Sequence, residues 1–331
     1  MREKKRVVVI GGGTGTMAVL SGLKDAADLD ISVIVSVTDD GGSNKVVRDE
    51  FGLLPLSDLR KSIIALSQSD NQLLRQLFTY RFDKGIGISG HTLGNLMMIA
   101  LSDITGSEVG AIDSARRLFQ VQGSVIPVTL EKTELVATYD SGDVVTGEHI
   151  IDEPRHKEAR RITHLGLSSD QVQAYPKAIE AIASADMIVA GPGDLYTSTL
   201  ANIIVPGIAE AIAAAKAQYV FINNLMTKRG QTDHMSASEI VAEIARYSKR
   251  TPDIVLQHTG NFPDEVLSMY RDRGEAAIID DMQDVSYRVC RESFVYDETI
   301  VKDSGDTLMR SLIRHDAQKV KKVLLDLLAQ I

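Results

Sequence analysis

The stretch VVVIGGGTGT, from Val7 to Thr16, runs from four β-branched residues directly into three glycines. Such a run followed by a glycine-rich turn is typical of the first strand and first helix of an α/β sheet. Glycine lets backbone N–H groups approach an anion, and the N-terminus of the following helix favours negative charge. We therefore predict that this loop binds a phosphate or another anion, with Thr14 and Thr16 as additional hydroxyl donors. A tight turn that holds no ligand is the alternative.

The loop departs from two well-known phosphate-binding motifs. In the dinucleotide fingerprint a third glycine would stand at Thr16, and in a P-loop a lysine and a hydroxyl residue would follow the last glycine. Neither pattern is complete in this chain. A pyridine-nucleotide oxidoreductase is therefore only a weakly supported hypothesis, and a triphosphate site of the P-loop kind is not expected.

Short β-branched runs continue to alternate with amphipathic segments along the chain. The runs typical of buried parallel strands cover residues 6–10, 31–37, 187–191, 219–223 and 253–257. Helices are predicted over residues 57–68, 176–185, 206–217 and 236–249, beginning with Ser57 and Asp58 as caps, Pro176, Pro206 and Ser236. A last helix, over residues 316–331, is expected on the outer face. Repeated βα units predict an α/β fold with a doubly wound, mostly parallel sheet.

One region breaks this alternation. Residues 124–151 alternate with period two around a turn at Asp140–Asp143, which predicts antiparallel hairpins, with the main sheet resuming near Met187. A length of 331 residues fits one large domain with an insertion as well as it fits two domains. We expect a single domain over residues 1–331 with an inserted β-hairpin region over residues 124–151.

The charge balance limits the classes of partner. Lys and Arg number 36 against 45 Asp and Glu, a net charge of −9, which opposes binding to nucleic acid or an anionic membrane. The densest basic run, residues 155–161, is expected to be a solvated connector. The apolar run after the charged N-terminus is too short for a signal peptide, so we expect the cytoplasm. The single cysteine, Cys290, lies in an alternating run and is expected to be a strand residue.

Carboxylates follow the second predicted strand directly. Because ligands of a doubly wound sheet bind beyond the carboxyl ends of the strands, Asp39 and Asp40 could contact a ribose or base. With a partner they could instead hold a divalent metal, and Asp58 opens a helix that returns toward the same edge. An Asx-turn or a helix cap is the alternative for the pair.

Two further glycine-rich loops carry polar candidates. In GISGHTLGN, residues 87–95, Asn95 is the favoured ligand contact because its amide does not titrate, and His91 is expected to be structural. Gly191-Pro192-Gly193 repeats the turn from a strand into a glycine loop. Two such loops in one sheet predict a diphosphate or a two-part ligand, unless both serve only as turns.

Together these motifs resemble those of a known family. GGGTG, DDGGS, LPLSDLRKSIIALS, GHTLGNL, GPGDLYTS, NNLMTKRGQTD and LIRHD follow the order found in the bacterial gluconeogenesis-factor family, within the superfamily of 2-phospho-L-lactate transferases. The resemblance extends from about Arg6 to the C-terminus. It implies a Rossmann-like fold that binds a nucleotide-type ligand across the strand ends.

The resemblance implies two functions of different class. Members like this chain are expected to bind UDP-sugars in the cytoplasm and to support cell shape and wall synthesis during growth on gluconeogenic carbon. The related enzymes are metal-dependent transferases that move a phospholactyl group from a nucleotide-linked donor to a deazaflavin. No catalytic residue is assigned, and the expected ligand is a nucleotide or nucleotide sugar. Magnesium, a homo-oligomer and partners in cell-wall synthesis are left open.

The family motifs also imply roles for single residues. Gly12, Gly13 and Thr14 would contact phosphate or sugar, and Asp39 and Asp40 would contact the base or, with Asp58, a metal. The residues that would complete the pocket are Asn95, Gly191, Gly193, Tyr196, Asn202, Asn224 and Arg314. For Arg314, a surface salt bridge with Asp316 is the alternative.

Three motifs depart from the family pattern. The usual DDGGSSGRLR is DDGGSNKVVR here, so Lys45 replaces a glycine, and the usual LPPGD is LPLSD, with Leu56 and Ser57. The usual GPGSLYTS is GPGDLYTS, so Asp194 puts a negative charge beside a proposed phosphate loop. We expect the fold to tolerate all three changes and the choice of ligand to depend on them.

Overall fold

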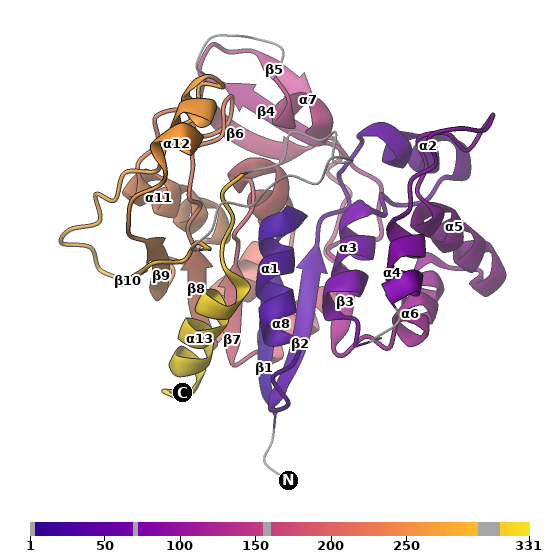
Figure 1. Ribbon diagram of the computed structural model, residues 1–331, viewed down its shortest axis with the longest axis horizontal. Helices are drawn as coiled ribbons and strands as arrows, with labels where there is room; N and C mark the ends of the chain where they lie inside the picture. The colour runs from indigo at the N-terminus through magenta and orange to yellow at the C-terminus, as the bar shows by residue number, and fades with distance from the viewer. Residues whose placement is uncertain (1–3, 69–71, 155–159, 297–311) are drawn as a thin grey trace.

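The computed structural model describes residues 4–68, 72–154, 160–296 and 312–331. Its main sheet has seven parallel strands in the order β10-β9-β8-β7-β1-β2-β3 (Figure 1). These are β1 (Lys5–Ile10), β2 (Leu29–Val35), β3 (Ser124–Pro127), β7 (Met187–Ala190), β8 (Gln218–Ile222), β9 (Ile254–His258) and β10 (Arg288–Glu292). The doubly wound α/β sheet predicted from the β-branched runs is confirmed, and Cys290 lies in β10.

The strand order creates a topological switch between β1 and β7. From β1 the chain continues to β2 and β3 on one side, and later enters β7 on the other side of β1. Loops that leave two such strands diverge, and the crevice between them is where ligands of open α/β sheets bind. The carboxyl ends of the strands form the upper edge of the sheet in Figure 1. The two glycine loops therefore flank the switch point.

Helices cover both faces of the sheet. Side chains alternate along β1, so that Val7 and Val9 join one core cluster while Val8 and Ile10 join the other. The first cluster includes α1 (Gly13–Leu23), α3 (Ser57–Leu66), α4 (Gln72–Thr79), α5 (Leu93–Thr105), α6 (Glu108–Leu118) and α13 (Ala317–Leu328). The second includes α8 (Pro176–Ser184), α10 (Ile208–Ala214) and α11 (Ala237–Ser248).

A separate three-stranded antiparallel sheet corrects the expected insertion. It consists of β4 (Leu135–Tyr139), β5 (Val144–Thr146) and β6 (Ile162–Leu167), in the order β5-β4-β6. The predicted turn at Asp140–Asp143 joins β4 to β5, with the Tyr139 amide donating to the Asp143 carbonyl. The boundaries 124–151 are nevertheless wrong at both ends, because β3 belongs to the main sheet and β6 lies beyond residue 151. Alternation identifies a strand but does not identify its partner.

The small sheet lies above the carboxyl edge of the main sheet (Figure 1). The short helix α7 (Glu148–Asp152) follows β5 and returns toward that edge. Buried residues of β4 and β6 join the core cluster that also contains α8, α10 and α11. The inserted segment is therefore packed onto the main sheet through a continuous core.

Two helix starts differ from the prediction. Helix α3 begins at Ser57, but its N-cap is Leu56 and no side chain caps it, because Ser57 and Asp58 bond to other segments. Helix α10 begins at Ile208, two residues after Pro206. The predicted caps of α8 and α11 are confirmed: Pro176 opens α8, and Ser236 forms a capping box with Glu239.

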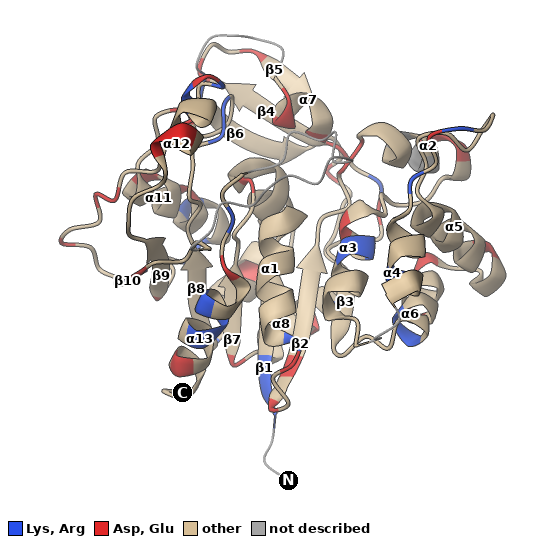
Figure 2. Ribbon diagram, viewed as in Figure 1, with Lys and Arg blue, Asp and Glu red and all other residues tan. Residues whose placement is uncertain are grey.

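Charges of both signs are spread over the fold. Figure 2 shows Lys and Arg on α3 and α13, and Asp and Glu on α7 and on α12 (Asp264–Arg271). Residues 155–159 of the predicted basic connector lie outside the described residues, and Arg161 donates to Glu239 at 2.9 Å. Among the described helices, none alone is long and apolar enough to cross a membrane, although the bent pair Leu195–Ile203 and Ile208–Ala214 meets that test together.

Candidate functional site

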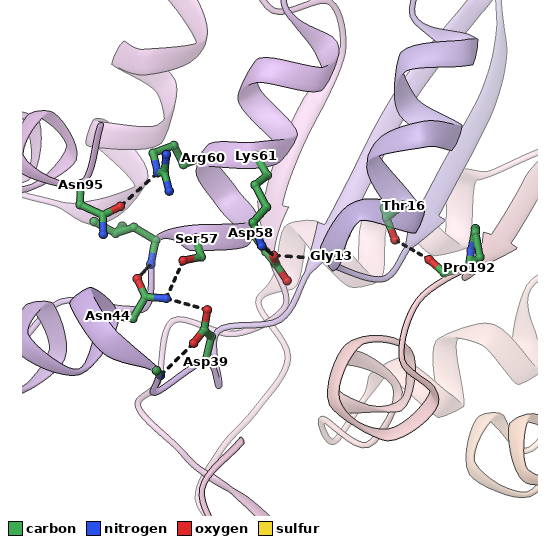
Figure 3. A network of polar contacts seen from close by, with 12 residues as sticks. Gly13, Thr16, Asp39, Asn44, Ser57, Asp58, Arg60, Lys61, Asn95 and Pro192 are labelled. Atoms are coloured by element: carbon green, nitrogen blue, oxygen red, sulfur yellow. Dashed lines mark hydrogen bonds and ion pairs between the residues drawn. The ribbon is translucent and has the colours of Figure 1, made fainter. Parts of the chain in front are cut away.

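The two glycine loops touch each other at the switch point. Gly13, the first residue of α1, has φ +68°, a conformation that other residues rarely adopt. A Cβ on Gly15 would lie 2.5 Å from the Pro192 carbonyl oxygen, and the Thr16 hydroxyl donates to the same oxygen at 3.3 Å (Figure 3). Thr16, which stands where the dinucleotide fingerprint has glycine, thus ties the first loop to the second.

A cavity of about 140 Å³ opens between these loops. It is bounded by segments from the beginning, middle and end of the chain. The lining residues are Gly13, Thr14, Gly15, Ala18, Pro192, Gly193, Asp194, Ser198, Asn224, Leu225, Met226, Tyr270, Ile313, Arg314 and His315. We call this the glycine-loop cavity.

Five of the predicted contact residues meet at this cavity: Gly13, Thr14, Gly193, Asn224 and Arg314. The Gly193 amide donates to the Asn224 side-chain oxygen at 3.2 Å, which fixes the second loop to the end of β8. The N-terminal turn of α1 also lines the cavity, and the first N–H groups of a helix have no acceptor within the helix. The lining combines the N-terminal turn of a helix with an asparagine and an arginine, which suits an anionic ligand.

Gly12 and Gly191 lie directly behind the cavity wall. A Cβ on Gly12 would collide with the Asp58 carboxylate. A Cβ on Gly191, which has φ +73°, would lie 2.9 Å from the Ile222 carbonyl oxygen. Both glycines therefore allow close packing of the loops, and neither lines the cavity itself.

Asp194 lines the glycine-loop cavity and lies beside a positively charged side chain. Lys228 lies 3.5 Å from Asp194 and 3.4 Å from Asp152. Burial, outweighing the attraction of Lys228, raises the pKa of Asp194 to about 6, and Asp152 and Glu275 raise it further. Burial alone would lower the pKa of Lys228, but Asp194, Asp152 and Glu275 raise it. Lys228, which the sequence reasoning missed, thus offsets the charge that Asp194 introduces.

Asp58 supports the first glycine loop. Its Oδ1 accepts the Gly13 amide at 3.3 Å and the Lys61 ammonium at 2.9 Å (Figure 3). A carboxylate at the N-terminus of α1 is stabilised by the helix dipole. The residue predicted as a cap of its own helix therefore holds the start of another helix.

Asp39 and Asp40 point into different parts of the structure. Asp39 accepts the Gly41 amide at 2.9 Å and the Asn44 side-chain amide at 2.7 Å, and Asn44 also donates to Ser57 at 2.7 Å (Figure 3). Asp40 accepts the His149 amide at 2.8 Å and thereby holds α7. The first aspartate forms the expected Asx-type turn, and the second connects the loop to the inserted segment.

Glu148 is an acidic residue that the sequence reasoning missed. Burial raises its pKa well above the usual range, and nearby Asp39, Asp152, Asp58 and Asp40 raise it further. Asp39 and Asp58 already accept protein N–H groups, and no group of three or more His, Cys, Asp or Glu within the described ranges is arranged to hold a metal. The residues predicted for magnesium do not fit a metal site as arranged.

Asn95 belongs to a neighbouring polar network. Its oxygen accepts from Arg60 at 3.1 Å (Figure 3). Its amide donates to the Ser43 hydroxyl at 2.8 Å. The Ser43 hydroxyl also lies 2.8 Å from His91 Nδ1. Asn95 and His91 are buried here and do not line the glycine-loop cavity. The network instead joins α2 (Gly42–Phe51) to α3 and α5. Lys45, which replaces a glycine of the family pattern, lies in α2.

Tyr196 and Asn202 are also placed away from the cavity lining. The Tyr196 hydroxyl donates to the Ile162 carbonyl oxygen at 3.3 Å and lies 3.1 Å from a Glu243 carboxylate oxygen. The Asn202 amide donates to the Ser198 carbonyl oxygen at 2.8 Å, and Ser198 lines the cavity. Both side chains support the π-helical turn Leu195–Leu200 that follows the second glycine loop.

Comparison with known proteins identifies relatives along the whole chain. A family model described as 2-phospho-L-lactate transferase CofD matches residues 7–295. The gluconeogenesis factor of Bacillus subtilis is 34% identical, with 100% of both chains covered. That of Listeria innocua is 37% identical, over 98% of this chain and 96% of its own.

A solved structure has the same fold. The crystal structure of protein BH3568 from Bacillus halodurans gives a TM-score of 0.88 at 35% identity, over 98% of this chain and 100% of that one. The family resemblance predicted from the seven motifs is confirmed by these matches. The chain therefore belongs to the CofD family, and it is similar over its full length to proteins named gluconeogenesis factors.

Proposed function

We propose that this protein binds a nucleotide sugar of the UDP-sugar class in the cytoplasm and acts as a gluconeogenesis factor that supports cell shape and wall synthesis. The phosphates would lie in the glycine-loop cavity. Binding alone suffices for a regulator, provided that the ligand favours one state of the protein over another. The names of the relatives from Bacillus subtilis and Listeria innocua support the gluconeogenic role.

The observation that carries the proposal is the meeting of three separate segments at the switch point. The loops after β1 and β7 line one cavity together with the N-terminal turn of α1, and Arg314 comes from near the end of the chain. Arginine suits a diphosphate because its planar fork donates two parallel hydrogen bonds and stays charged. A chain of net charge −9 needs such a local cation to attract an anion.

The second candidate is a 2-phospho-L-lactate transferase-like enzyme, which the match to the CofD family model favours. Such an enzyme would need a positioned acid, base or metal beside the ligand. Glu148, whose pKa is raised, is the candidate acid, but the carboxylates in the described ranges do not form a metal site.

Calorimetry with uridine, guanosine and nicotinamide nucleotides separates the candidates. We expect the tightest binding from a UDP-sugar, with affinity unchanged by magnesium or by a chelator. Turnover that requires magnesium and a deazaflavin acceptor would favour the transferase instead. Preference for a nicotinamide dinucleotide would favour the oxidoreductase hypothesis.

Variants of Asp39 and Asp40 test whether ligand binding depends on magnesium. Asp39→Asn keeps an oxygen for the Gly41 amide but puts an NH2 group opposite the Asn44 side-chain amide, so we expect a loss of unfolding free energy of about 1–3 kcal/mol. UDP-sugar affinity should stay independent of magnesium in this variant and in Asp40→Asn. Thermal unfolding and calorimetry with and without chelator measure both effects. Magnesium dependence in the wild type that either variant abolishes would contradict the expectation.

The raised pKa of Asp194 predicts a pH dependence of binding. Below about pH 6 Asp194 takes up a proton, so repulsion of an anionic ligand falls, whereas His315 in the same cavity, with a pKa lowered to about 4 by burial and by His258, stays neutral. A UDP-sugar keeps both diphosphate charges through this range. Its affinity should therefore rise about fivefold between about pH 7.5 and pH 5, a modest effect because Asp194 is partly exposed.

Asp194→Asn is the control for this titration. Calorimetry on the variant should give a nearly flat pH profile at the higher affinity that the wild type reaches in acid. Asp152 and Glu275 remain in the variant, and Lys228 keeps a carboxylate partner. An unchanged slope in Asp194→Asn would assign the titration to another group.

A further inference from the structure

A second cavity, of about 500 Å³, lies at the carboxyl ends of β8 and β9. Leu225 lines both this cavity and the glycine-loop cavity, so the two adjoin. The other walls of the larger cavity come from the loop after β9, from α12 and from the segment that follows α12, and they include Phe262, Leu267 and Ile278. A ligand with its phosphates between the glycine loops could therefore extend into this space, which we call the β9 cavity.

One side chain in the wall of the β9 cavity has an unused donor. His258 is only 9% exposed, and its Nδ1 accepts the Phe294 amide at 3.0 Å. Burial, with a contribution from Lys319, lowers the pKa of His258, so the ring is neutral near neutral pH. Because Nδ1 is the acceptor, the proton of this neutral ring lies on Nε2. That N–H has no partner among the described residues.

The position of the unused donor relates it to the cavity. A Cβ on Gly260 would lie 3.6 Å from His258 Cε1 and 3.7 Å from Nε2, so this edge of the ring faces Gly260, which lines the cavity. The His258 ring packs on Phe262 with centroids 4.8 Å apart. A buried N–H without an acceptor is destabilising, so a ligand that supplies an acceptor gains affinity.

We propose that the β9 cavity holds the nucleobase of the ligand, a flat ring whose carbonyl oxygen accepts the His258 Nε2–H. This inference rests on the proposed function and adds a second part to the same site. Leu225, Leu267, Ile278 and the Phe262 ring offer apolar and aromatic surface, which suits the faces of a base. The lining also holds the polar side chains Gln257, Asn261 and Asp264, which can bond the edge of a base, and His258 Nε2 is the one buried side-chain polar atom of the described lining without a partner.

Two variants test the cavity through affinity. Leu267→Trp fills the space, and His258→Asn keeps an acceptor for the Phe294 amide while removing the Nε2 donor. The probes are UDP, UDP-glucose and inorganic pyrophosphate, measured by calorimetry. We expect both variants to weaken UDP binding at least tenfold and to leave pyrophosphate within about twofold of the wild type. Met269→Trp, also on α12 but 46% exposed and outside the lining, should match the wild type.

Three results would overturn the proposal. Unchanged UDP affinity in Leu267→Trp would mean that the base lies elsewhere. Equal losses for UDP and pyrophosphate would mean that the variants disturb the phosphate site. Loss of the preference for UDP-glucose over UDP, with UDP itself unaffected, would assign the cavity to the sugar.

A second measurement does not depend on phosphate binding. In protein labelled with ¹⁵N-histidine, the Nε2–H signal of His258, identified by its absence in His258→Asn, should shift on titration with uridine or guanosine. It should not shift with glucose or pyrophosphate. If UDP-sugars fail to bind the wild type, the proposed function fails while this titration still decides the cavity. A signal unmoved by either nucleoside would refute the nucleobase assignment.

Discussion

Arg314→Ala is expected to weaken UDP-sugar binding roughly 10- to 100-fold, equivalent to about 1.5–3 kcal/mol. Arg314 lines the glycine-loop cavity together with Gly13, Thr14 and Gly193. It is two residues before Asp316, whose carboxylate caps α13 by accepting the Gln318 and Lys319 amides. The cap fixes the path of the chain just after Arg314, so the variant removes a guanidinium from the cavity without removing the cap.

Two further variants separate charge from geometry. Arg314→Lys keeps the positive charge but loses the planar fork, so it should recover only part of the lost affinity. Arg117→Ala removes an equal charge from α6, where the side chain is exposed and bonds to Ser114. We expect that control to bind like the wild type. Wild-type affinity in Arg314→Ala would remove Arg314 from the site, and a large loss of ligand-free stability would assign it to the fold.

The positions of the glycine loops could be predicted from the sequence because each follows a β-branched run. Parallel strands end at one edge of a sheet, so the loops after Ile10 and Ala190 had to lie at the same edge. Their direct contact, through Gly15 and Pro192, depends on β7 pairing with β1. No local pattern encodes that pairing. The family motifs, which placed Arg314 in the pocket, supplied long-range information that residue patterns lacked.

The remaining differences involve partners chosen by tertiary structure. Ser124–Pro127 has the alternation of a hairpin strand, yet it pairs in parallel with β2. Asp58 precedes a helix in the manner of a cap, yet it accepts from Gly13, 45 residues earlier. Glu148 has no sequence signal of its own, because its raised pKa comes from burial and from four aspartates, three of which lie on other segments. Lys228 could have been found by asking which cation offsets Asp194.

The contact between the loops leads to the second large effect, which is expected for Gly15→Ala. Helix propensity alone predicts that alanine at this position of α1 stabilises the protein by about 1 kcal/mol. The new Cβ would, however, lie 2.5 Å from the Pro192 carbonyl oxygen and 2.8 Å from the carbonyl carbon, and backbone atoms cannot move aside as a flexible side chain can. We therefore expect a net loss of unfolding free energy of about 1–3 kcal/mol. The sign of the change alone distinguishes this clash from the stabilisation that helix propensity predicts.

Gly22→Ala is a matched control on the same helix. A Cβ there would also collide with a backbone carbonyl, that of Ala317 at the start of α13, but Gly22 does not line the glycine-loop cavity. Denaturant unfolding should show both variants destabilised to a similar degree. Calorimetry should show UDP-sugar affinity reduced about tenfold, or about 1.4 kcal/mol, in Gly15→Ala alone, because only that variant separates the two loops. Equal affinities in the two variants would mean that the contact between the loops serves the fold and not the ligand.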